Sequence, residues 1–223
     1  IMKKVAILFI VLLTSSFVFA QNTYVPDDKF EQTLIDLGYD TTLDDSVVTA
    51  NISGVTNLNI SEKEISDLTG IEAFTALTHL DCSYNQLTSL DMSNNTVLVE
   101  LQVQDNQLTS LDVTANTTLL ELELQTNKLT SLDVSKNTAL TYLDCYGNYL
   151  TSLDVTANTA LTHLECGYNH RLLASLDVSK NTALTYLSCH DNKLTSLDVS
   201  ANTALIYLKC SENQLTSLDV SNN

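Results

Sequence analysis

The chain has 223 residues, a formal net charge of −17 and 44% apolar residues, so it can bury a sizeable core and is not a disordered acidic tail. Its ten Lys and Arg residues against 27 Asp and Glu residues argue against nucleic acid or an anionic membrane surface as a partner, because both require clustered basic side chains. Cationic, neutral and calcium-bridged partners remain open.

Residues 1–20 have the features of a cleavable signal peptide. Lys3 and Lys4 precede an apolar run over 5–13 that is too short to span a bilayer. Val18 and Ala20 supply small residues for a cut after Ala20. We therefore expect an exported protein, secreted or held at the cell surface, whose mature chain has no membrane span.

Residues 21–54 are expected to form an N-terminal helical cap. The segment 26–37 predicts one helix, with Pro26 in its first turn, Asp27 and Asp28 at its positive end, and Gly38 after its last turn. Three apolar side chains share one face of this helix: Phe30, Leu34 and Leu37. We expect that face to cover the open apolar end of the repeats that follow.

Residues 55–223 repeat one pattern. A leucine recurs in steps of 21 residues, with one step of 23, at Leu77, Leu98, Leu119, Leu140, Leu161, Leu184 and Leu205. Arg171 and Leu172 account for the longer step, and a degenerate copy beginning at Val55 brings the number of strand segments to eight. We expect the natural chain to continue beyond Asn223, which falls in the middle of a truncated last repeat.

Each copy reads Leu-x-x-Leu-x-(Cys/Leu/Val)-x-x-Asn-x-Leu, which is the leucine-rich-repeat consensus. Period-2 alternation sends Leu143 and Cys145 to one side of a strand and Tyr142 and Asp144 to the other. One strand cannot bury its apolar side alone, but parallel copies stacked about 4.8 Å apart can. We therefore predict an α/β right-handed leucine-rich-repeat solenoid with a parallel β-sheet on its concave face. Because 21 residues leave no room for a full helix, short extended and turn segments should form the convex face.

Three columns of identical residues should be structural. An Asn column ends the strands and should bond backbone groups that would otherwise be unpaired: Asn85, Asn106, Asn127, Asn148, Asn169, Asn192 and Asn213. A Cys column should hold buried free thiols, because parallel neighbours do not meet disulfide geometry: Cys82, Cys145, Cys166, Cys189 and Cys210. An Asp column should bond turn N–H groups, with calcium binding as the alternative: Asp91, Asp112, Asp133, Asp154, Asp177, Asp198 and Asp219.

The outward strand positions carry the candidate binding residues. Aromatic rings are expected at Tyr142, His163, Tyr186, Tyr207, Tyr146 and His190, and carboxylates at Asp144, Glu165, Glu121 and Glu123. Tyr makes large contacts at a small entropic cost, so a basic protein patch, or a sugar that stacks on rings and bonds to carboxylates, would fit this face. The alternative is that aromatic residues are present only because they suit strands.

The same face offers little for catalysis. Glu165, Ser188 and His190 lie on adjacent repeats, but a Ser on an open sheet has no oxyanion pocket. Zinc held by His163 with Glu165, or by His79 with Asp81, is a weak alternative. We expect no enzymatic activity, no cofactor and no resident metal.

The run Tyr24-Val-Pro-Asp-Asp-Lys-Phe, the run Ile65-Ser-Asp-Leu-Thr-Gly-Ile and the Leu-x-x-Leu-x-Cys-x-x-Asn repeats resemble internalin-type bacterial leucine-rich-repeat proteins, most closely the secreted ones of Bacteroidetes. The resemblance covers residues 24–223 and implies a helical cap, a right-handed solenoid and binding of protein or glycan through the concave sheet. The 21-residue step and the Cys column depart from that family. We expect a monomeric secreted or cell-surface recognition and adhesion module, or else a structural spacer without a specific ligand.

Overall fold

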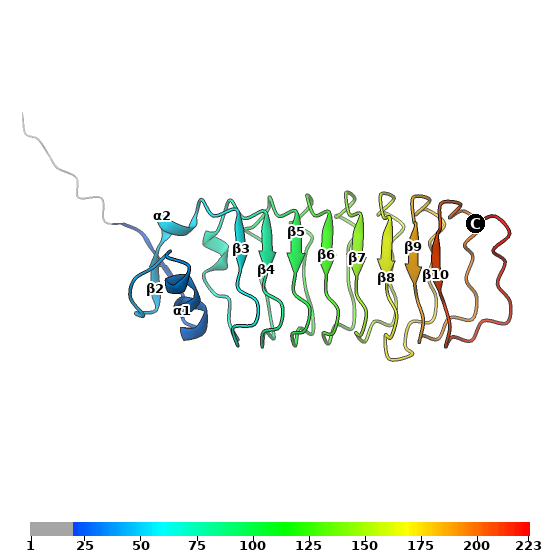
Figure 1. Cartoon of the computed structure of the whole chain (residues 1–223), viewed down its shortest axis with the longest axis horizontal. Helices are drawn as coiled ribbons and strands as arrows, with labels where there is room; N and C mark the ends of the chain where they lie inside the picture. Colours follow the sequence, from blue (N-terminus) through cyan, green and yellow to red (C-terminus); the bar gives the residue numbers. More distant parts are fainter. Residues whose placement is uncertain (1–19) are drawn as a thin grey trace, which may run out of the picture.

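The short strands are stacked into one elongated array of chain turns. The computed structural model describes residues 20–223, and the proposed signal peptide lies almost entirely outside them. Figure 1 shows the strands side by side along the molecule, with the N-terminal helices at one end. No helix within 20–223 has the length and apolarity that a bilayer crossing requires.

Eight parallel strands form the main sheet, in the order of the chain. They are β3 (Asn57–Asn59), β4 (His79–Asp81), β5 (Glu100–Gln102), β6 (Glu121–Glu123), β7 (Tyr142–Asp144), β8 (His163–Glu165), β9 (Tyr186–Ser188) and β10 (Tyr207–Lys209). Equivalent repeat positions pair across the sheet, as Tyr142 does with His163 and Leu143 does with Leu164. The predicted parallel solenoid and its eight strand segments are confirmed.

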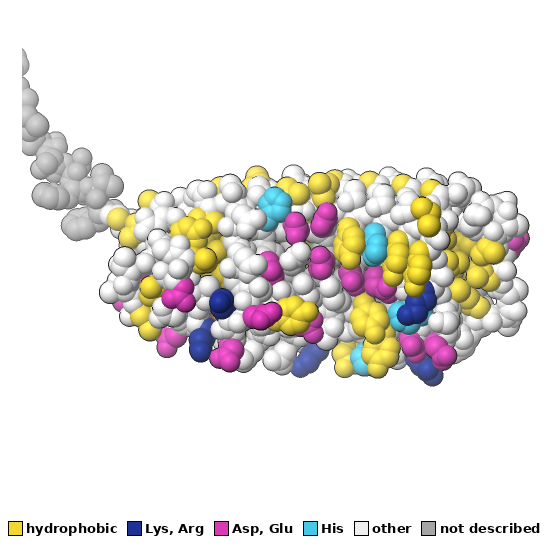
Figure 2. Space-filling view, in the orientation of Figure 1, with side chains coloured by type: hydrophobic (Ala, Val, Ile, Leu, Met, Phe, Trp, Pro, Cys, Tyr) yellow, Lys and Arg dark blue, Asp and Glu magenta, His cyan; other side chains and the backbone are white. Residues whose placement is uncertain are grey.

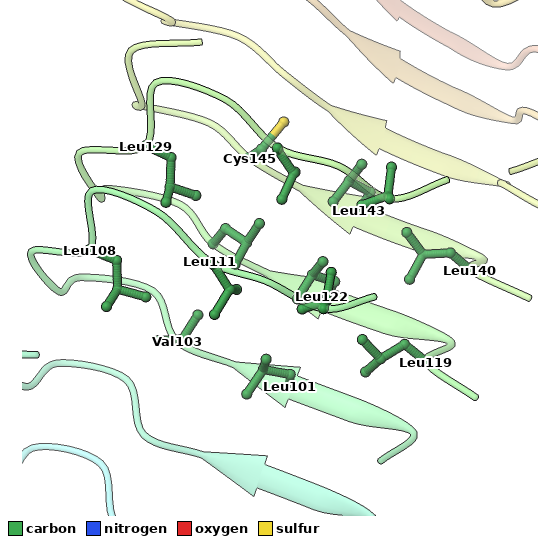
Figure 3. Close-up of a cluster of buried hydrophobic side chains, with 14 of the residues drawn as sticks. Leu101, Val103, Leu108, Leu111, Leu119, Leu122, Leu129, Leu140, Leu143 and Cys145 are labelled. Carbon is green, nitrogen blue, oxygen red and sulfur yellow. The ribbon is translucent and has the colours of Figure 1, made fainter. Parts of the chain in front are cut away.

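The core is a set of leucine columns running through the stack. The central residue of every strand from β3 to β9 is buried, and Leu143, Cys145 and Leu150 of one repeat are all 0% exposed. Figure 3 shows Leu101, Leu122 and Leu143 lying in line on successive strands, with Leu119 and Leu140 beside them. Each buried leucine contributes about 1.5–3 kcal/mol before chain entropy is subtracted, so neighbouring turns stabilise one another.

The predicted Asn column bonds the backbone of two turns at once. The Asn148 side-chain nitrogen donates to the carbonyls of Leu124 (3.0 Å) and Cys145 (3.2 Å), and its Oδ1 accepts the N–H of Leu129 at 3.0 Å. Asn148 is 0% exposed. Its amide therefore supplies partners for peptide groups that the turn after β7 would otherwise leave unpaired.

A second buried Asn column lies on the opposite side of the turns, and the sequence interpretation missed it. Asn158 is 0% exposed and its Nδ2 donates to the carbonyls of Val134 and Asn137, both at 2.9 Å. The other buried members are Asn95, Asn116, Asn137, Asn181 and Asn202. Each of these residues begins an Asn-Thr pair, which resembles an ordinary polar loop in the sequence although its amide links adjacent turns.

The N-terminal segment contains α1 (Asp28–Asp36), α2 (Thr49–Ile52) and a two-stranded antiparallel sheet of β1 (Asn22–Tyr24) and β2 (Ser46–Val48); a 3-10 helix, η1 (Ile71–Ala73), precedes β4. Asp27 is the N-cap of α1, so Pro26 precedes the helix. The prediction that Pro26 lies in the first turn is wrong. Phe30 and Leu34 are buried as expected, and the Phe30 ring lies 6.4 Å from that of Phe74.

One residue of the predicted apolar helix face was placed wrongly. Leu37 is 46% exposed, because α1 ends at Asp36 and the chain turns away through Gly38 at φ +81°. Glu31, which was not among the residues predicted to be buried, is 0% exposed instead. Its carboxylate accepts the backbone N–H groups of Asp44, Asp45 and Ser46 at 2.9–3.1 Å and thereby ties the helix to the start of β2.

Candidate functional site

The outward side chains of β4–β10 and of the residues directly after those strands form one continuous surface, here called the strand face. Figure 2 shows a row of aromatic side chains over β7–β10 with carboxylates beside them. The seven strands contribute six carboxylates to this face and one lysine, Lys209. All ten predicted binding residues lie here, although their role in binding stays a prediction.

Four rings stack across β7–β10 into what we call the ring ladder: Tyr142, His163, Tyr186 and Tyr207. Successive ring centroids are 4.3, 4.0 and 4.4 Å apart, and the angles between ring planes are 13°, 7° and 3°. The parallel register puts these positions opposite one another, so the close strand spacing sets the stacking distance. Partial burial of the ladder lowers the pKa of His163 below its ordinary 6.5, although Glu165 and Glu123 act in the other direction.

Beside the ladder runs the carboxylate row, which comprises Glu123, Asp144 and Glu165 on β6, β7 and β8. Asp144 accepts the N–H of Tyr146 at 3.0 Å, and Glu165 accepts the hydroxyl of Tyr186 at 3.2 Å. Burial, reinforced by the charges of Glu165 and Glu123, raises the pKa of Asp144 to about 7. The row thus collects like charges in a partly dehydrated place.

A second group of rings lies on the other side of the carboxylate row. This second ring cluster comprises Tyr146, Tyr149, Tyr168, His170 and His190. The ring of Tyr146 is 5.7 Å from that of Tyr168 and 5.8 Å from that of His190, and His170 stacks on Tyr149 at 4.1 Å. Tyr149, Tyr168 and His170 were not predicted as site residues. His170 lies in the longer repeat step, where three residues separate Asn169 from Leu173 instead of the one that separates Asn148 from Leu150.

The cluster is built on unusual backbone. One position of each repeat is left-handed, at φ between +52° and +67°, in Tyr84, Asp105, Thr126, Gly147, Tyr168, Asp191 and Glu212. Gly147 adopts this conformation without strain, whereas a tyrosine there costs about 1 kcal/mol or more. His170 and Arg171 are also left-handed, at φ +48° and +57°. Tyr168 occupies the repeat position that Gly147 occupies one turn earlier, and this equivalence was the sign in the sequence that the backbone of Tyr168 is left-handed.

The Cys column packs inside the stack, away from the strand face. All five cysteines are free, and four of them are buried, while Cys210 on the last turn is partly exposed. Burial raises the pKa of the Cys189 thiol to about 12. Such thiols stay protonated at neutral pH and unreactive.

The Asp column bonds its own turns, as predicted. Asp133 accepts the N–H of Ser135 at 2.9 Å, and Asp154 accepts that of Thr156 at 2.9 Å. Hydrogen bonds from the backbone and side chain of Ser135 lower the pKa of Asp133, and those from the side chain and backbone of Thr156 lower the pKa of Asp154. Within residues 20–223, the one trio of potential metal ligands close enough to share an ion is Glu31, Asp40 and Asp44, which includes neither the column nor the proposed zinc pairs.

The residues considered for catalysis do not form a relay. Ser188 Oγ lies 2.9 Å from His190 Nδ1, and a Glu165 oxygen lies 4.0 Å from the same nitrogen. A Ser-His-carboxylate triad uses the two different ring nitrogens for its two partners. Ser188 is also 0% exposed, so its hydroxyl does not reach solvent.

No protein-family profile matches the chain. Internalin J of Listeria monocytogenes is 44% identical over 75 residues, which are 34% of this chain and 8% of that protein. A solved domain of the Listeria protein InlJ, described as including a cysteine ladder, is 36% identical over 91% of this chain and 55% of its own, with a TM-score of 0.70. This chain therefore spans 8% of the length of Internalin J and 55% of the solved InlJ domain.

Two further structures share the fold. A leucine-rich-repeat protein of Leptospira interrogans has a TM-score of 0.69 at 28% identity, covering 74% of this chain and 45% of that one. Internalin C2 of Listeria has a TM-score of 0.73 at 22% identity, over 93% and 94% of the two chains. These similarities support an internalin-like leucine-rich-repeat protein, whereas the narrower resemblance to Bacteroidetes proteins stays a prediction.

Proposed function

We propose that this internalin-like chain is a secreted or cell-surface recognition module without catalytic activity, which binds a protein or glycan ligand through its strand face. Leucine-rich-repeat relatives of the internalin type suggest a protein-interaction module. Residues 1–20 would direct export, 21–54 would cover the end of the stack, and 55–223 would carry the ligand as a monomer. Adhesion is the biological role that such a module would serve.

The observation that carries the proposal is the placement of the rings. Six of the nine tyrosines lie on the strand face or directly after its strands, and Tyr207 is 44% exposed. The core does not need them, because the buried side of the same strands is already filled by leucine and cysteine. Exposed rings held on a rigid frame are typical of binding hot spots.

The test is the triple variant Tyr142→Ala, Tyr186→Ala and Tyr207→Ala. Binding to a panel of immobilised proteins and glycans should fall about tenfold or more, because aromatic hot spots cost about 2 kcal/mol or more each when truncated. The matched control is Tyr24→Ala, which removes a ring that is 61% exposed and lies outside the strand face. The control should bind like the wild type.

Circular dichroism must show that both variants keep the fold. A ladder variant that binds every panel member as tightly as the wild type would refute the proposal. A wild-type chain that binds nothing would favour the alternative, a spacer that sets the distance between other parts of a surface protein.

A further inference from the structure

Between its two end rings, the ring ladder offers edges and a tyrosine hydroxyl to a ligand, and not ring faces. Its neighbouring rings are 4.0–4.4 Å apart and within 13° of parallel, so the faces of His163 and Tyr186 are covered on both sides. A sugar that stacks on an aromatic residue, and a cation held by a cation–π contact, both need a free face. Only the two ends of the ladder keep one.

At the centre of the strand face, the carboxylates are therefore the groups with which a ligand can interact most strongly. No Lys or Arg within residues 20–223 lies in ion-pair distance of Glu123, Asp144 or Glu165. The Glu165 side chain is only 14% exposed, and its nearest cationic candidate is His190 at 4.0 Å. The row is held between the ladder and the second ring cluster, so partial dehydration strengthens its interactions with an incoming charge.

We infer that the ligand of the strand face is a protein segment bearing Lys or Arg side chains, which the carboxylate row receives between the two groups of rings. This inference rests on the proposed function and names the chemistry of the partner. Charge complementarity favours it, because the strands of this face carry six carboxylates and one lysine on a chain of net charge −17.

Tyrosine hydroxyls complete the site. Tyr186 already donates to Glu165 at 3.2 Å, and burial together with that carboxylate raises the pKa of Tyr186 to about 12, so the hydroxyl stays protonated. The edges of the ladder then pack against the aliphatic stems of Lys or Arg, while the ammonium or guanidinium groups reach the carboxylates. A neutral glycan would gain only hydrogen bonds from the same surface.

The experiment compares two variants that each remove three carboxyl groups and so make the same change in formal charge. The site variant is Glu123→Gln, Asp144→Asn and Glu165→Gln, and the control is Asp133→Asn, Asp154→Asn and Asp177→Asn. Asn keeps the acceptor oxygen that each Asp of the column uses to bond its own turn, as Asp177 does with Ser179. The probes are a peptide alternating Lys and Ser, its Glu-containing counterpart and a neutral oligosaccharide, with affinities from calorimetry at low and physiological salt.

The Lys peptide should bind the wild-type chain and the control within about twofold of each other, and the site variant about tenfold more weakly or worse. The Glu peptide should not bind. Equal weakening in both variants would overturn the inference, because the effect would then come from the overall charge of the chain and not from the carboxylate row. Failure of the Lys peptide to bind the wild-type chain at low salt would overturn it as well.

The triple Tyr variant separates this inference from the proposed function. Oligosaccharide binding that requires Tyr142, Tyr186 and Tyr207 but not the carboxylates would refute the basic partner and keep the strand face as a binding surface. If the Tyr variant binds every probe as the wild type does, both proposals fail.

Discussion

The charged form of Asp144 suits the proposed binding of a basic ligand but destabilises the folded protein. Its pKa of about 7 lies above the ordinary 3.8 because folding buries its carboxyl group next to Glu123 and Glu165. Between these two values the folded chain binds more protons than the unfolded chain, so the free energy of unfolding falls as pH rises from about 4 to about 7. Above about pH 7 the free energy of unfolding has lost all of this contribution, because the folded protein then holds Asp144 in its charged form in a partly buried place.

Asp144→Asn should therefore stabilise the protein at about pH 8, and the gain in melting temperature should shrink towards about pH 4. Asn retains an acceptor for the N–H of Tyr146. Asp133→Asn is the matched control and should show no such gain, because hydrogen bonding by Ser135 lowers the pKa of Asp133 and favours its charged form. Thermal melts across this pH range decide the matter; a gain independent of pH would contradict the buried charge as its cause.

At the scale of one turn, the two Asn columns hold the stack from opposite sides. Asn148→Leu and Asn158→Leu should each cost about 1–3 kcal/mol, because each leaves buried backbone carbonyls without a donor. For a chain of this size this corresponds to about 2–4 °C of melting temperature per kcal/mol. Asn94→Leu, at an exposed position, is the control and should melt like the wild type. An unchanged melt of Asn148→Leu would show that its amide is dispensable.

The repeat pattern predicted the strands, the inward columns and the outward residues, because period and alternation fix which side chains share a side. It did not predict what depends on rotamers or on contacts between turns. The amide of Asn158 looked like part of a polar loop, the closed ring faces of the ladder depend on side-chain torsions, and Tyr149 joins the site only through His170 in the longer step. The exposure of Leu37 depends on where α1 stops.

At the scale of the whole molecule, the solenoid separates stability from recognition. Each turn contacts its neighbours through buried leucine, cysteine and asparagine, which leaves the opposite side of the strands free to vary. The ring ladder, the carboxylate row and the second ring cluster all lie over β6–β10, whereas β4 and β5 bear one ring, His79, and mostly charged or amide side chains. Binding should therefore be confined to the part of the strand face nearer the C-terminus.

The most direct test of this account is hydroxyl-radical footprinting of the chain with and without the bound peptide of alternating Lys and Ser. We expect reduced oxidation of Tyr142, Tyr146, Tyr186 and Tyr207, with Tyr24 and Tyr84 unchanged. Protection spread evenly over all six rings, or confined to Tyr24 and Tyr84, would contradict it.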